Sequence, residues 1–160
     1  MTDPRSIKNG ARGWLTDSRV YNLVWLGRWL ERFDGLSRML GAIARSAEDV
    51  AGARAFEGSL QSAALAYGVA GPESEASAED QVAAFGELMA SCLRSARDDA
   101  TQVGSLELIQ ELNTILEEFP GVWSSVEGAT GLSRATQYLP SRMDEVTAVC
   151  EQGWFKSRSA

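Results

Sequence analysis

The sequence predicts an all-α protein: a bundle of five or six helices preceded by an irregular N-terminal arm. Through most of the chain, apolar residues recur at steps of three and four, which places them on one face of a helix. No segment alternates between apolar and polar residues over the length of a strand. Glycine, proline and serine interrupt the periodic stretches, so we expect several helices rather than one. A chain of 160 residues can bury the core of one domain without disulfides or metals.

The arm is expected at residues 1–16, which mix proline, glycine and charged residues. Asp17 or Ser18 can begin the first helix, because either side chain can accept a hydrogen bond from a free backbone N–H. That helix should extend to about residue 46, with its apolar residues on a single stripe. The stripe consists of Leu23, Leu26, Leu30, Phe33, Leu40 and Ile43.

The middle of the chain predicts two more helices. The second is expected at about 49–67, and the glycine, proline and serine of residues 68–78 indicate a loop after it. Ser77 should cap a third helix at about 78–103, with Asp80 three residues later as in a weak capping box.

Two helices are then expected between Gly104 and Pro140. Ser105 should cap a fourth helix at 106–118, which the Phe-Pro-Gly sequence at 119–121 ends. A fifth helix fits 121–138, although its two glycines weaken it.

The last helix is expected at 142–152, after a break at the proline and a cap at Ser141. Gly153 should end it, which leaves residues 153–160 as a loose tail. The predicted helical domain therefore covers 17–152, between the arm and the tail.

Composition excludes several classes of function. The net charge is -7, which argues against general nucleic-acid binding and against binding to anionic membranes. The first 54 residues hold nine basic and six acidic side chains, whereas the rest hold six and sixteen, so the basic excess lies around the first helix. The N-terminus has no apolar run of the kind found in a signal peptide, and no stretch has the roughly 18 apolar residues of a membrane span. We expect a cytoplasmic protein.

The absence of histidine removes Ser-His-Asp and Cys-His catalysis and histidine-based metal sites. Cys92 and Cys150 lack the spacing of a metal site and are interpreted as plain buried thiols, with a disulfide as the alternative. We therefore predict no catalytic residue, no metal and no cofactor.

One stretch stands out, "NLVWLGRWLERFDGLSRML" at residues 22–40. Arg28, Glu31, Arg32 and Arg38 fall at three- and four-residue steps on one stripe of the first helix, so Glu31 can pair with a neighbouring arginine. Large aromatics flank this Arg/Glu cluster; they are Trp25 and Trp29.

Three interpretations of the Arg/Glu cluster stay open. It can be a solvated face with weak ion pairs. It can be a buried network that joins the first helix to Asp98, Asp99 or Glu111 further along the chain. It can also be an anion site, because two guanidinium groups braced by one carboxylate keep donors for a phosphate or a carboxylate.

The same stretch resembles the signature of the bacterial alpha-E family, helical proteins named for a Glu-Arg motif. Trp29 stands where the family usually has an aromatic residue. The matching residues are Asn22, Leu23, Trp25, Gly27, Arg28, Leu30, Glu31, Arg32, Arg38 and Leu40. A second segment, "RSARDDATQVGSLELIQELN" at 94–113, is similar to a later part of the family pattern. It matches at Arg97, Ala100, Val103, Ser105, Leu112 and Asn113.

The resemblance implies an accessory role. Alpha-E proteins accompany ATP-grasp amide-forming ligases or are fused to them, so the implied function is partner binding in ATP-dependent amide or peptide-bond formation rather than catalysis. Two alternatives remain. One is a substrate-binding or catalytic component in which the Arg/Glu cluster holds a phosphate or carboxylate. The other is a plain structural helical oligomer.

The C-terminal tail suggests a contact surface. Family members usually carry a second Glu-Arg motif, and this chain has one. Trp154 and Phe155 either fold back on their own bundle or bind a partner chain, and we expect the second: a ligase or another copy of this chain.

Overall fold

The all-α prediction is confirmed, with five helices and no strand in the part of the chain that the structure describes. The computed structural model describes residues 17–49, 52–103 and 105–158. The predicted arm at 1–16 lies outside these residues. The helices are α1 (Asp17–Asp49), α2 (Gly52–Ala66), α3 (Ala78–Val103), α4 (Leu106–Ser124) and α5 (Gly128–Arg158).

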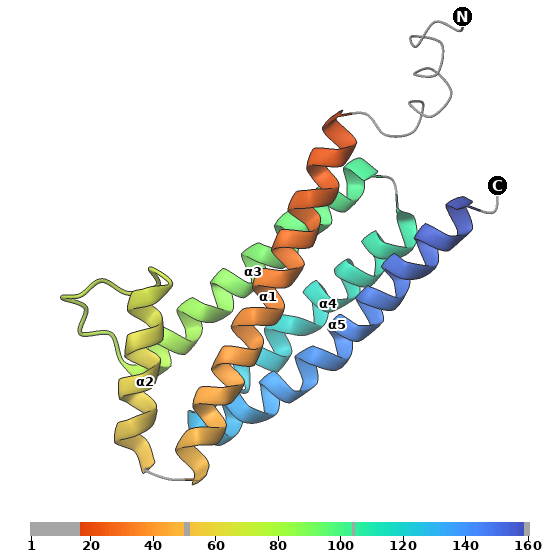
Figure 1. Ribbon diagram of the computed structural model, residues 1–160. Coiled ribbons are helices and arrows are strands. Elements are labelled where there is room, and N and C mark those ends of the chain that lie inside the picture. The colour runs from red at the N-terminus through yellow and green to blue at the C-terminus, as the bar shows by residue number, and fades with distance from the viewer. Residues whose placement is uncertain (1–16, 50–51, 104, 159–160) are drawn as a thin grey trace, which may run out of the picture.

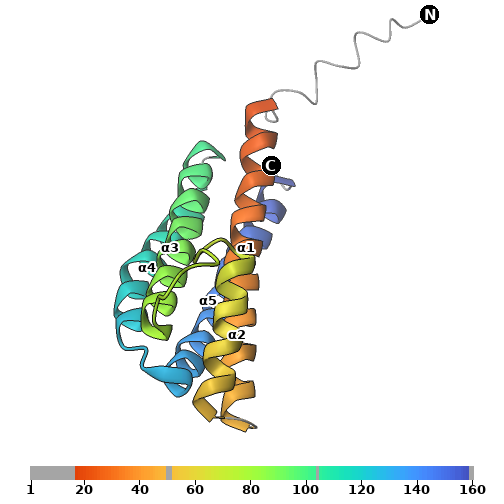
Figure 2. The same cartoon turned by 90° about the vertical axis from the view of Figure 1, so that its left-hand side faces the viewer.

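Four of the helices form a closed ring in which each packs against the next. α1 packs on α3 and α5, and α4 completes the ring between those two. Neighbouring helices in the ring run in opposite directions (Figure 1), as in an antiparallel four-helix bundle. α2 lies outside the ring, against α1 and α3 (Figure 2).

The core is built from the apolar stripes of all four ring helices, and α2 adds its own buried residues, Leu60 among them. α1 comes close to α5 at Gly41, where an added Cβ would lie 2.8 Å from the Thr136 hydroxyl oxygen. Large side chains with less than 2% of their surface exposed are Phe33, Phe85, Leu36, Leu40, Leu60, Met89, Leu93, Leu112, Ile115, Leu132, Leu139 and Val146.

Two predicted helix caps are confirmed. The Ser77 hydroxyl accepts a hydrogen bond from the Asp80 backbone N–H at 3.1 Å, at the start of α3. The Ser105 hydroxyl accepts one from the Leu108 N–H at 3.4 Å, at the start of α4. Both hydroxyls satisfy an N–H group that has no partner inside the helix.

The predicted end of the fourth helix at 119–121 is wrong, because α4 continues through Pro120 to Ser124. Pro120 lies on the exposed side of the helix, where water can reach the carbonyl that the proline leaves without a donor. Phe119 and Trp123 are buried on the opposite side, and their rings stack 5.3 Å apart. Packing on both sides of the proline therefore maintains the helix.

The predicted break at Pro140 is also wrong, because α5 is a single helix from Gly128 to Arg158. Leu139 and Met143 continue one buried stripe across the proline. Ser141 is not a cap, since its hydroxyl donates to the Tyr138 carbonyl at 2.7 Å inside the helix.

The helix boundary lies earlier, at 125–127, where the turn between α4 and α5 replaces the middle of the predicted fifth helix. Gly128 has a φ of +61°, a conformation that glycine adopts without strain. The predicted end at Gly153 is wrong as well, because the helix runs through it. None of the described helices is long and apolar enough to cross a membrane.

Candidate functional site

The Arg/Glu cluster lies on the solvent side of α1. Arg28, Glu31, Arg32 and Arg38 are all exposed. Arg38 donates from Nε to an Asp34 carboxylate oxygen at 2.7 Å. Among the described residues, no ion pair joins Glu31 to either neighbouring arginine. The cluster has the geometry of an exposed face. Within the described part of the chain, neither the expected bond at Glu31 nor an ion-pair network to Asp98, Asp99 or Glu111 is found.

The aromatic residues beside this cluster form a row along α1. Tyr21, Trp25 and Trp29 are spaced four residues apart, and adjacent ring centroids lie 6.1 Å and 5.6 Å apart. The Arg28 guanidinium lies over the Trp25 ring, 5.8 Å from its centroid. The row therefore already holds one cation on an aromatic face.

A groove of about 350 Å³ separates this aromatic row from α3. Its α3 wall consists of Ser95, Asp98 and Asp99, and its α1 wall of Tyr21, Trp25 and Trp29. Both walls lie toward the same end of the bundle, where α1 begins and α3 ends (Figure 1). We call this space the α1–α3 groove.

The two carboxylates of the groove differ in their partners. Asp98 accepts from the Arg97 guanidinium at 3.2 Å. Partial burial raises the pKa of Asp99, the Trp29 side chain opposes that rise by hydrogen bonding to the carboxylate, and the Asp98 charge adds to it. Asp99 makes no ion pair with any residue that the structure describes.

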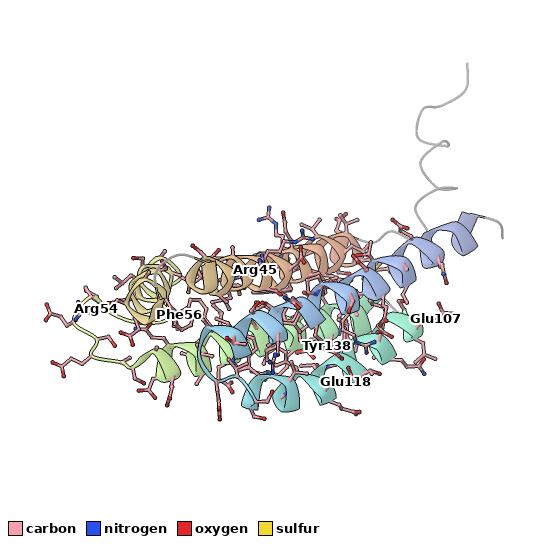
Figure 3. The ribbon with its side chains drawn as sticks, turned by 90° about the horizontal axis from the view of Figure 1, so that it is seen from below. Arg45, Arg54, Phe56, Glu107, Glu118 and Tyr138 are labelled. Carbon is pink, nitrogen blue, oxygen red and sulfur yellow. The ribbon has the colours of Figure 1, made fainter. Side chains whose placement is uncertain are left out.

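A second charged cluster, absent from the sequence analysis, lies between α4 and α5. Arg142 is 15% exposed and lies 3.4 Å from both Glu111 and Glu118, and its guanidinium also donates to Glu145. Tyr138 donates its hydroxyl to Glu118, and these two residues are neighbours in Figure 3. We call these five residues the Arg142 cluster.

Three carboxylates around one guanidinium give the Arg142 cluster an acidic excess. Burial raises the pKa of Glu111, and Arg142 opposes that rise, while Glu145 and Glu118 add to it. The hydrogen bond to Glu118 raises the pKa of Tyr138. Arg142 and Glu111 are largely covered between the two helices, whereas Glu118 and Glu145 reach the solvent.

A sequence signal for the Arg142 cluster exists. Glu111 and Glu118 are seven residues apart on α4, and Tyr138, Arg142 and Glu145 follow at steps of four and three on α5. Such spacings place each set on one helix stripe. The wrong break at Pro140 separated Tyr138 from Arg142 and concealed the α5 stripe, whereas both α4 glutamates lie within the predicted fourth helix.

The other residues singled out in the sequence are two aromatics near the C-terminus and two cysteines. Trp154 and Phe155 belong to the last turns of α5, and their side chains lie outside the described part of the chain. Both cysteines are free, with Cys92 buried and Cys150 half-buried. Burial raises the pKa of the Cys92 thiol, and the charge of Arg32 opposes the rise. Nowhere in the described ranges do three or more Cys, Asp or Glu side chains gather as metal ligands.

Comparison with known proteins identifies a family. Residues 18–151 match a family model described as Alpha-E, a predicted alpha-helical domain with a conserved ER motif. The sequence contains a single Glu-Arg dipeptide, Glu31-Arg32, which places the motif on the exposed side of α1. No curated protein and no solved structure matches the chain.

Proposed function

The chain belongs to the Alpha-E family, and from this premise we propose that it is an accessory helical subunit that binds an ATP-grasp-type, amide-forming ligase. The ligase class comes from the family resemblance, in which alpha-E proteins accompany such ligases. The proposed contact surface is the exposed face of α1. It consists of Gly27, Arg28, Glu31, Arg32 and Gly35, and we call it the ER face.

The observation that carries the proposal is the exposure of Glu31 and Arg32. A polar motif that a family keeps on its surface indicates binding or chemistry, since packing does not require it there. In this chain the core side of α1 is supplied by other residues, such as Phe33 and Leu36. The motif is therefore available to a partner.

Two glycines on the ER face support the same conclusion. Gly27 and Gly35 lie four residues before and after Glu31, so all three share one stripe. A Cβ added at either glycine would meet no atom within 4 Å. Glycine in a helix costs roughly 0.5–1 kcal/mol relative to alanine, and nothing in the described residues offsets that cost. A partner that approaches the α1 backbone closely would account for both residues.

The test is co-purification of the full chain with an ATP-grasp ligase from its native host, identified by mass spectrometry. We expect the ligase to be retained by the wild-type chain and by Gly58→Leu. Gly58 is an exposed glycine of α2 that also has open space around its Cβ position, so it is a matched control. Gly35→Leu should fold equally well but lose the ligase, because its side chain fills the ER face.

Other outcomes would contradict the proposal. Equal ligase retention by Gly35→Leu and Gly58→Leu would show that the ER face is not the contact. Capture of further copies of the chain, with no ligase, would instead support a plain helical oligomer.

A further inference from the structure

The α1–α3 groove has an aromatic wall and an acidic wall, and both kinds of surface attract cations. On α1, the row formed by Tyr21, Trp25 and Trp29 presents aromatic faces, whose electron-rich surfaces attract cations. On α3, Asp98 and Asp99 present carboxylates, which accept hydrogen bonds from ammonium and guanidinium groups. Neither wall is suited to an anion.

The length of the groove favours an extended ligand. Tyr21 and Trp29 are eight positions apart in the sequence, which corresponds to about 12 Å along a helix at 1.5 Å per residue. A single headgroup would cover one ring, whereas a linear aliphatic stem can lie along several. Tyr21 is 62% exposed, so this end of the row is open to a ligand.

The charges of the groove leave one carboxylate available. Arg97 pairs with Asp98, and Arg28 stacks on Trp25. Asp99 shares the lining of the groove with Trp29, and no cation among the residues that the structure describes pairs with it. Its desolvation without a counter-ion raises its pKa, and a bound cation would relieve that cost.

We infer that the α1–α3 groove binds an organic cation, an ammonium or guanidinium group on a linear aliphatic stem, with the charged nitrogen at Asp99 and the stem along Trp25 and Trp29. The Arg28 guanidinium on Trp25 is an example of the same contact made within the chain. The inference is independent of the ligase proposal, because the proposed ligand contacts Asp99, Trp25 and Trp29, none of which belongs to the ER face.

The experiment titrates the full chain with two cations and follows binding by calorimetry and tryptophan fluorescence. One cation is 1,4-diaminobutane, a free amine, and the other is the capped tripeptide Gly-Arg-Gly, which represents an arginine side chain of a partner. The neutral analogue 1,4-butanediol, of equal length, controls for the aliphatic stem. We expect saturable binding of at least one cation and none of the diol. Which cation binds identifies the source of the charged group.

Two substitutions assign the binding to the groove. Asp99→Asn should weaken the affinity by about tenfold or more, because it removes the carboxylate that meets the cation. Asp144→Asn removes the same charge from an exposed position of α5 and should leave the affinity unchanged. Trp25→Leu, which removes one aromatic face, should also weaken binding and provides a second test if Asp99→Asn lowers the melting temperature.

Three results would overturn the inference. The first is that neither cation saturates the protein below ~10 mM. The second is that the diamine and the diol bind equally well. The third is that the Asp99→Asn and Asp144→Asn proteins bind the cation with equal affinity. The last would mean that the cation responds to the general acidity of the chain rather than to the groove.

Discussion

Aromatic and charged residues lie on two sides of the bundle. They are largely enclosed on one side and face the solvent on the other. On the α3–α4–α5 side, Trp123 and Arg142 lie largely covered against groups of the same bundle. Arg142 Nε and a Glu111 oxygen are buried there within ion-pair distance of their partners but without a hydrogen bond. The Trp123 indole N–H donates to the Val82 carbonyl at 2.9 Å, and its ring stacks on Phe119. We call this the sealed side.

On the α1–α3 side, the corresponding groups face outward. Trp25 and Trp29 are half-buried and border a groove, where Trp29 also packs against the edge of the core. Asp99 has no counter-ion among the described residues. Glu31 and Arg32 of the ER face are exposed and make no ion pair with each other. We call this the open side. The comparison teaches that aromatic and charged residues stabilise the fold where they are enclosed, and are available for recognition where they are not.

The largest loss of stability is expected from a substitution on the sealed side, at Gly86. A Cβ at this position would lie 2.2 Å from Nε1 of Trp123, so Gly86→Ala forces the buried indole away from its hydrogen bond to Val82. We expect a loss of about 3 kcal/mol in the free energy of unfolding, measured with urea, because overpacking and a lost buried hydrogen bond act together. Gly27→Ala on the open side should instead gain about 0.5–1 kcal/mol from helix propensity.

Equal stabilities of Gly86→Ala and Gly27→Ala would contradict the distinction between the two sides. A loss for Gly27→Ala would show that its Cβ position is occupied in the folded protein, contrary to the open space around it.

Local signals predicted much of this fold. Ser77 and Ser105 begin helices because a hydroxyl next to a free N–H acts within a few residues. Pro120 and Pro140 did not end helices, because the buried residues on each side outweigh the local preference of proline. That balance depends on contacts with other helices, which a local pattern does not contain.

The candidate site was predictable to a smaller extent. The sequence identified Trp25 and Trp29 and suggested that Asp98 or Asp99 would pair with arginines of the first helix. In the structure, Asp99 lies with Trp29 in the lining of the α1–α3 groove, and no described arginine pairs with it. The spacing of residues on α1 says which share a stripe, but not which stripe faces α3. The packing of the whole bundle decides that point.

A second prediction compares charged residues on the two sides. Arg142→Met leaves Glu111, Glu118 and Glu145 together without a counter-ion, and should lower the free energy of unfolding by about 2 kcal/mol. The cost is less than for a fully buried pair, because Glu118 and Glu145 are 43% and 53% exposed and can turn toward water. Glu31→Gln on the open side should change the same quantity by no more than about 0.5 kcal/mol. Chemical denaturation at pH 7 measures both.

A larger loss of stability for Glu31→Gln than for Arg142→Met would contradict this distinction between the sealed side and the open side. Breaking a buried pair costs about 1–3 kcal/mol in the free energy of unfolding. A loss of about 1 kcal/mol or more for Glu31→Gln would therefore mean that the ER motif stabilises the fold. The case for the ER face as a recognition surface would then weaken.

The smallest expected change in stability comes from Glu111, one of the three carboxylates around Arg142 on the sealed side. Its pKa is raised above the ordinary value of 4.5, mainly by burial, so the folded state favours the protonated carboxyl.

The stabilisation that the bound proton gives to the folded state is complete at acid pH and is lost as the pH rises through the raised pKa. Glu111→Gln carries no charge at any pH, so its stability relative to the wild type should increase from near zero at about pH 4 to a gain within about 1 kcal/mol at pH 7. Thermal unfolding across this range measures the difference, with Glu117→Gln, an exposed carboxylate of the same helix, as the baseline. If Glu111→Gln is instead the less stable protein at pH 7, the attraction of Arg142 exceeds the cost of burial, and the carboxylate of Glu111 is a net stabilising partner.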